Sequence, residues 1–120
     1  FKPGNEVIAM PGGKFGGHAE YIVMPETAAI AQKPENMSLE EAVTLVFGGG
    51  TMAAFFDFTK VKPGDEVLVN GGSSSTGTAA IQIAKHFGAM VTAVTSGGNA
   101  ELVRSTTPRR TFPTTASVTA

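Results

Sequence analysis

The stretch VLVNGGSSSTGTAAIQIAKHFGAMVTAVT, residues 67–95, decides the fold. The run from 66 to 70 is short and nearly all apolar, as is typical of a strand covered on both faces of a parallel sheet. The apolar residues of the next segment recur at i, i+3, i+4 and i+7, which predicts one buried helical face ended by Gly88. Residues 90–94 then predict a second parallel strand. The sequence therefore predicts a β-α-β unit and an α/β fold. The residues of the helical face are Ala80, Ile83, Ala84 and Phe87.

The glycine-rich segment 71–77 joins the first strand to the helix. Such a turn brings free backbone amides and the positive end of a helix dipole to one point, which suits a phosphate group. The structural alternative is a tight turn without a ligand, and the flanking strand and helix favour phosphate over it. A mononucleotide P-loop needs a lysine after its second glycine, but Thr78 follows Gly77 here. A dinucleotide is the better prediction.

The end of the second strand indicates which dinucleotide. NAD-binding folds place a carboxylate about twenty positions after the turn, where it binds the adenosine ribose. Here the segment from Thr95 to Asn99 offers hydroxyls, glycines and an amide instead. A pocket without a carboxylate does not repel a 2′-phosphate, so NADP(H) is favoured over NAD(H). Arg104 is the nearest basic residue and lies a turn or more onward.

The upstream half reads differently. Residues 6–10 predict a short strand, and the alternation from His18 to Met24 predicts a half-buried strand of a small β domain. Ser38 and Glu41 have the S-x-x-E spacing of a capping box, which predicts a helix from Leu39. The glycines at 48–50 are expected to interrupt it before a second helical stretch begins at residue 51.

Composition and charge disfavour several classes of function. The 120 residues carry a net charge of −1 and no cysteine, so no basic stripe predicts nucleic acid or membrane binding, and no cysteine can hold a metal. We expect no signal peptide or membrane span, and by default a cytoplasmic protein. Residues 105–120 are rich in Thr, Pro and Arg, which predicts a disordered tail.

Several segments together resemble one family. The chain from residue 1 to 104 is similar to the medium-chain dehydrogenase/reductase superfamily, in its zinc-independent, quinone-oxidoreductase-like (zeta-crystallin-like) branch. The segments that carry the resemblance are residues 16–21 (GGHAEY), 33–38 (KPENMS), 50–53 (GTMA), 62–71 (KPGDEVLVNG) and 80–85 (AIQIAK).

The resemblance implies a division of the chain. Residues 1–45 would be the C-terminal part of a GroES-like β domain, and residues 46–104 the opening of a Rossmann domain, a doubly wound parallel sheet. Residues 105–120 depart from the family's continuation into a third strand. By the same resemblance, the chain begins inside the family's first domain and would come from a homodimeric protein.

The resemblance also implies an activity, the transfer of hydride from NADPH to quinones or α,β-unsaturated carbonyls. Thr51 would lie by the nicotinamide, and the 2′-phosphate would be surrounded by Thr95, Ser96 and Asn99. No residue is assigned a catalytic role, and His18 is read as structural rather than as a metal ligand. The pyrophosphate would lie on the turn residues Gly71, Ser73, Ser74, Ser75, Thr76 and Gly77.

Two features weigh against an active enzyme. Ser74 replaces the middle glycine of the family's G-x-x-G-x-x-G turn, so we expect its side chain to face the phosphate path and to weaken binding. A half-sheet would also leave an unpaired edge. The alternative hypothesis is therefore an inert remnant or a nucleotide-binding regulatory protein. A short-chain dehydrogenase is disfavoured because Tyr21, the single tyrosine, has no lysine four positions on.

Overall fold

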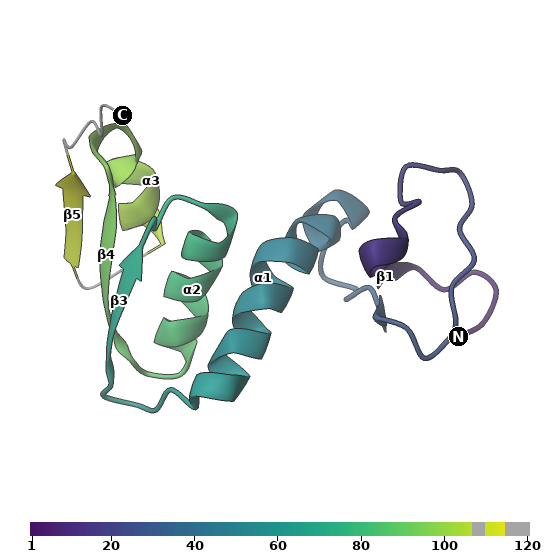
Figure 1. Ribbon diagram of the computed structural model, residues 1–120, viewed down its shortest axis with the longest axis horizontal. Helices are drawn as coiled ribbons and strands as arrows, with labels where there is room; N and C mark the ends of the chain where they lie inside the picture. The colour runs from purple at the N-terminus through teal and green to yellow at the C-terminus, as the bar shows by residue number, and fades with distance from the viewer. Residues whose placement is uncertain (107–109, 115–120) are drawn as a thin grey trace. The chain divides into compact units, whose positions relative to one another are not determined.

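The computed structural model describes residues 1–106 and 110–114 (Figure 1). The chain divides into two compact units, Phe1–Val46 and Phe47–Ala120. Each unit is built around its own strands, antiparallel in the first and parallel in the second. The α/β class predicted from the sequence is confirmed.

The first unit holds a two-stranded antiparallel sheet. β1 (Val7–Ala9) pairs with β2 (Ile30–Gln32), with Val7 opposite Gln32, and the short 3-10 helix η1 (Gly12–Lys14) follows β1. Lys33 fastens the sheet to the next turn, because its Nζ lies 3.1 Å from Glu6 Oε2 and donates to the carbonyl of Met37 at 2.7 Å. The strand predicted at residues 6–10 is present in its central three residues.

The strand predicted from His18 to Met24 is wrong. This segment is an irregular loop in which Tyr21 is 89% exposed and Val23 is 99% exposed. A strand needs a hydrogen-bonded partner, and among the described residues the partner of β1 is β2, which the sequence analysis missed. Alternation alone therefore predicted a strand where no pairing forms.

α1 (Leu39–Thr59) is one continuous helix, and its start was predicted correctly. The Ser38 amide donates to Glu41 Oε2 at 2.8 Å, and the Glu41 amide donates to Ser38 Oγ at 3.1 Å, which is a complete capping box. The expected interruption at residues 48–50 is wrong. Glycine lowers helix propensity by about 1 kcal/mol per residue but does not remove a hydrogen bond, so packing can hold it in a helix.

The length and composition of α1 also bear on membranes. Among the described residues it is the helix long and apolar enough to cross a bilayer, with a mean hydropathy of 1.3 over its most apolar window. No such segment was expected from the sequence. Core helices of globular proteins can have the same length and composition.

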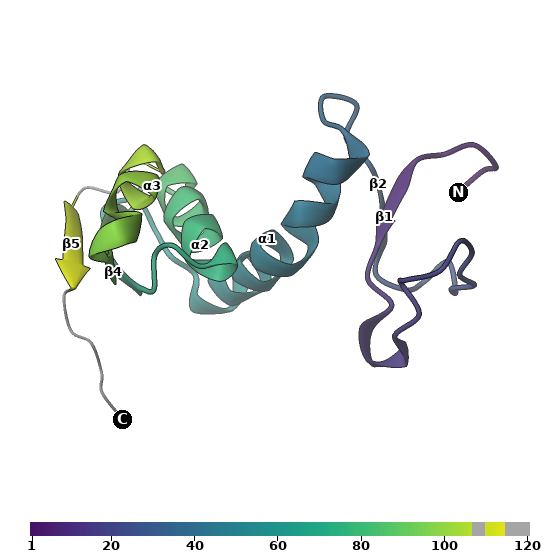
Figure 2. The ribbon, with the colours of Figure 1, turned by 90° about the horizontal axis from the view of Figure 1, so that it is seen from above.

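The second unit is a parallel sheet with helices on one face. β3 (Glu66–Asn70), β4 (Met90–Ser96) and β5 (Arg110–Thr114) lie in that order, and α2 (Ser75–His86) and α3 (Ala100–Ser105) cover the same side (Figures 1 and 2). The 3-10 helix η2 (Gly97–Asn99) leads into α3. The largest fully buried side chains at the centre are Ile81, Val91 and Val103.

The β-α-β unit predicted for residues 67–95 is confirmed, with Glu66 opposite Met90 and Asn70 opposite Val94. The disordered tail is wrong for residues 110–114. These residues form β5, which pairs in parallel with β4 from Thr92 to Ser96. The free edge of β4 offers backbone donors and acceptors, and threonine and phenylalanine suit a strand. Residues 107–109 and 115–120 lie outside the described part of the chain.

Candidate dinucleotide site

The glycine turn lies between β3 and α2 and is fastened to the end of β4. The amides of Gly71 and Gly72 both donate to the carbonyl of Val94, at 3.0 and 2.9 Å. Gly71 has φ +79, a left-handed conformation that glycine adopts without the strain other residues incur. These bonds fix the turn at the carboxyl end of the sheet, where ligands bind in open α/β folds.

Two further glycines allow close packing. A Cβ built on Gly77 would collide with the carbonyl oxygen of Gly71, so α2 approaches the turn more closely than any other residue would permit. A Cβ on Gly72 would come within 3.3 Å of Ala93 Cβ and Val103 Cγ1. The glycines at these positions therefore bring the start of α2 and the face of the sheet together.

Ser74 is the N-cap of α2. Its backbone is extended, at φ −73 and ψ 164, so the position does not require glycine. Its Oγ accepts from the Gly77 amide at 2.9 Å and donates to the Gly71 carbonyl at 2.9 Å. The hydroxyl expected to face the phosphate path is therefore bonded inside the turn, where it uses one of the amides that a helix leaves free at its start.

Three backbone amides of the turn are free to donate a hydrogen bond to a ligand. The backbone N–H groups of Ser73, Ser75 and Thr76 have no acceptor among the described residues. Ser75 and Thr76 are the first residues of α2, a helix of 12 residues whose dipole places partial positive charge at this end. An anion at this point would satisfy donors that the fold leaves open.

The residues at the end of β4 differ in exposure. Ser96 and Asn99 are exposed, and Asn99 Nδ2 donates to Ser96 Oγ at 3.0 Å and to Ser73 Oγ at 3.2 Å. Thr95 is 4% exposed, and its Oγ1 has no hydrogen-bond partner among the described groups. A buried hydroxyl without a partner costs about 1–3 kcal/mol, so Thr95 has unused capacity beside the site.

α1 contacts the turn through Gly48, which is buried. A Cβ on Gly48 would lie 2.5 Å from both the carbonyl oxygen and Oγ of Ser75. The close neighbour of Gly48 is therefore the first residue of α2. Thr51, one helical turn further, is exposed.

A cavity of about 290 Å³ lies beside the turn, between the second half of α1, β3 and the start of α2. Its walls are mainly apolar, with Phe55 and Phe56 from α1 and Val69 from β3. Asn70 and Thr76 bring the polar groups. An apolar chamber with a few polar groups, adjoining an anion site, is the form that small-molecule sites take.

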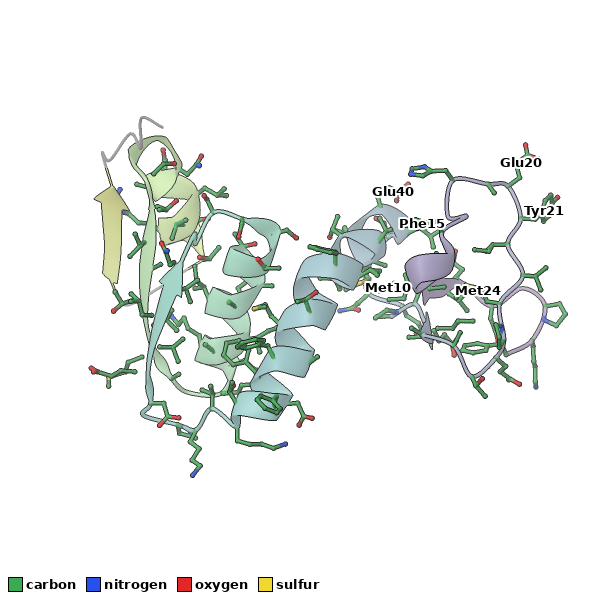
Figure 3. The ribbon with its side chains drawn as sticks, in the orientation of Figure 1. Met10, Phe15, Glu20, Tyr21, Met24 and Glu40 are labelled. Carbon is green, nitrogen blue, oxygen red and sulfur yellow. The ribbon has the colours of Figure 1, made fainter. Side chains whose placement is uncertain are left out.

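A second cavity, of about 550 Å³, lies within the first unit. Met10, Phe15 and Met24 border it, while Glu20 and Tyr21 point away from it (Figure 3). Among the side chains that the structure describes, none of those lining this cavity is charged. Within the described residues no three His, Asp or Glu side chains gather to hold a metal ion.

Two carboxyl groups on α1 have a shifted pKa. A bond with its own backbone amide, and then one with Ser38, lower the pKa of Glu40 at the helix start. Lys60 lowers the pKa of Asp57, because its Nζ lies 2.8 Å from Asp57 Oδ1. Both are fully exposed, so these shifts belong to the ends of the helix and not to the site.

Comparison with known proteins agrees with this geometry. The chain is 38% identical over 113 residues to the tomato (Solanum lycopersicum) 2-methylene-furan-3-one reductase, covering 87% of this chain and 29% of that protein. The chain spans less than a third of the length of the curated relatives that it matches. No protein-family model matches the chain.

Solved structures of oxidoreductases are also similar to this chain. A probable oxidoreductase from Mycobacterium abscessus superposes with a TM-score of 0.79 at 36% identity, over 93% of this chain and 36% of that one. A quinone oxidoreductase from Thermus thermophilus, solved also with NADPH, superposes with a TM-score of 0.64 at 28% identity, over 69% of this chain and 28% of that one.

Proposed function

Because this chain is a homologue of the quinone and enoyl reductases of the medium-chain dehydrogenase/reductase superfamily, we propose that it binds NADP(H) for hydride transfer to a quinone or an α,β-unsaturated carbonyl. The observation that carries the proposal is the turn at residues 71–77. It combines three amides without an acceptor, the N-terminus of α2, and glycines that let α2 start close against the turn.

The turn would hold the pyrophosphate through backbone groups. The amides of Ser73, Ser75 and Thr76 donate without needing to reorganise, because their positions are set by the bonds from Gly71 and Gly72 to Val94. The Ser74 hydroxyl accepts from the Gly77 amide, so one donor fewer is left for the phosphates. We therefore expect the chain to bind NADPH, but with lower affinity than a variant with glycine at residue 74.

The end of β4 supports NADP(H) over NAD(H). Ser96 and Asn99 present neutral polar groups on the surface, and neither carries the carboxylate that would bind a free ribose hydroxyl and repel a phosphate. Thr95 is buried, so it does not present its side chain on the surface as Ser96 and Asn99 do.

The cavity beside the turn is the place for the reacting ring. When bound there, reduced nicotinamide supplies the hydride. Phe55 and Phe56 would exclude water, and Asn70 and Thr76 would orient polar groups. Thr51 lies on the same helix as the two phenylalanines, and we propose that it lies near the ring.

The division of the chain follows from the same family. We infer that the first unit corresponds to the GroES-like domain, and that β3, α2, β4, α3 and β5 open a Rossmann domain. The parallel order β3-β4-β5 with both helices on one face supports the second assignment. The antiparallel pair β1-β2 supports the first.

Thermal unfolding and NADPH oxidation together test the proposal. Circular dichroism melts of the chain with and without NADPH should show one cooperative transition that moves upward with the cofactor, because a ligand that binds only the folded state stabilises it. Oxidation of NADPH should then be followed with phenanthrenequinone as acceptor, with the same mixture lacking protein as the blank. No shift of the melt at any NADPH concentration would rule the proposal out.

A second candidate is a nucleotide-binding protein without catalysis. The observation that favours it is β3, which borders the described sheet and exposes Leu68 to 69%. A melt that shifts with NADPH, together with no quinone-dependent oxidation, would select this candidate over the enzyme.

A further inference from the structure

The Asn99 side chain joins the two ends of the candidate site. Its Nδ2 lies 3.2 Å from Ser73 Oγ in the turn and 3.0 Å from Ser96 Oγ at the end of β4. Ser73 and Asn99 are 26 positions apart in the chain. One exposed amide therefore connects the segment proposed for the pyrophosphate to the segment proposed for the adenosine ribose.

The direction of these bonds decides what each group has left to offer. A side-chain amide nitrogen carries two hydrogens, and both are donated here, so Asn99 keeps only its carbonyl oxygen, an acceptor that an anion does not attract. A hydroxyl that accepts a hydrogen bond keeps its own hydrogen to donate. Neither Ser73 nor Ser96 donates that hydrogen to another described group.

We infer that Asn99 is a positioning residue for cofactor specificity: by donating to Ser73 and Ser96, it leaves both serine hydroxyls as donors for the 2′-phosphate of NADP(H). This rests on the proposed function, since it assigns residues to one phosphate of the same cofactor. Asn99 acts through the serines and does not contact the phosphate. At the same end of β4, the Oγ1 of the neighbouring Thr95 also has no hydrogen-bond partner among the described groups.

Asn99→Asp reverses the bridge and keeps its shape. A carboxylate accepts only, so both serine hydrogens would turn inward to it, and the two segments would stay joined while the donors were lost. The fold should therefore keep its melting temperature. Asn36→Asp is the matched control, because it adds the same charge at an exposed turn of the first unit.

Ser96→Ala separates hydrogen-bond direction from charge. It removes one of the two donors and adds no charge, so direct repulsion between an added carboxylate and the phosphate cannot explain its effect.

The experiment measures dissociation constants of NADPH and NADH by calorimetric titration of the full chain and its three variants. We expect Asn99→Asp to weaken NADPH about tenfold while NADH, which lacks the 2′-phosphate, changes less than about twofold. We expect Ser96→Ala to weaken NADPH about threefold, again without changing NADH. Asn36→Asp should leave both constants as they are.

The ratio of the two constants separates the possible failures. An unchanged ratio in Ser96→Ala, or an equal loss of both cofactors in Asn99→Asp, would overturn the inference and leave the proposed function standing. If the unmodified chain bound neither NADPH nor NADH, the proposed function would fall, and the inference with it.

Discussion

Two glycine-rich segments meet in the second unit, and they are rich in glycine for different reasons. In the turn, Gly71 holds a left-handed backbone, and Gly77 has no room for a Cβ beside the Gly71 carbonyl. In α1 the glycines are helical. A Cβ on Gly48 would meet the first residue of α2, while a Cβ on Gly50 would face open space. Local geometry explains the turn, whereas a tertiary contact explains the helix.

This contrast indicates where glycine matters for function. The turn needs Gly77 so that α2 can start against the Gly71 carbonyl, so a substitution there should change stability as well as binding. The helix needs Gly48 to approach the turn, so substitutions there should change stability first. Substitutions at Gly77, Gly48 and Gly50 test this contrast.

Gly77→Ala should have the largest effect. Its methyl group would meet the backbone of Gly71, which cannot rotate away, so we expect a loss of roughly 3 kcal/mol in the free energy of unfolding, the upper end for overpacking. Urea denaturation followed by circular dichroism measures it. A variant as stable as the parent chain would show that α2 does not approach the turn this closely.

Gly48→Ala should come second. Its methyl group would lie 2.5 Å from two atoms of Ser75, but one of them belongs to a side chain that can rotate. Alanine also favours the helix by about 1 kcal/mol, so we expect a net loss of about 1–2 kcal/mol. The same denaturation measures it, and a gain in stability would place α1 away from the turn.

Ser74→Gly should affect binding more than stability. Replacing a serine N-cap by glycine costs only a few tenths of a kcal/mol. The substitution frees the Gly77 amide, so we expect NADPH to bind about threefold more tightly by calorimetric titration. Ser74→Ala is the control, because it also frees the amide but loses the cap and should destabilise the chain by about 1 kcal/mol. Weaker binding in Ser74→Gly would mean that the serine hydroxyl itself serves the phosphate.

Gly50→Ala should have the smallest effect, of the opposite sign. The new methyl group would enter open space on a helical residue, so we expect a gain of about 0.5–1 kcal/mol in unfolding free energy with NADPH binding unchanged. A loss of NADPH affinity in this variant would instead indicate that the cofactor lies against α1 at this glycine.

The same contrast explains what the sequence predicted. The β-α-β unit at residues 67–95 was predicted because strand, turn, helix and strand each leave a local pattern, and the Ser38–Glu41 capping box does so too. The continuous α1 was missed because the residue that leaves room only for glycine at position 48 is Ser75, which is distant in sequence. The strand expected at residues 18–24 failed, and β5 was missed, because pairing depends on which edges are available.

The candidate site was predicted as a set of residues but not as an arrangement. The turn residues could be named because glycine spacing between a strand and a helix is a local signal. The inward bonding of the Ser74 hydroxyl, the burial of Thr95 and the bridge made by Asn99 depend on side-chain direction, which spacing does not contain. Thr51 and the other assigned residues remain predictions until binding is measured.

The proposed function depends above all on amides of the turn holding the phosphates of NADP(H), and Ser75→Pro removes one of those amides. Residue 75 is the first of α2, where proline is well tolerated, and the extended backbone of Ser74 suits a following proline. The variant should therefore keep the melting temperature. Calorimetric titration with NADPH should show saturable binding to the unmodified chain, about tenfold weaker in Ser75→Pro. Equal binding by the two chains, or no binding by the unmodified one, would contradict a phosphate site built from these amides.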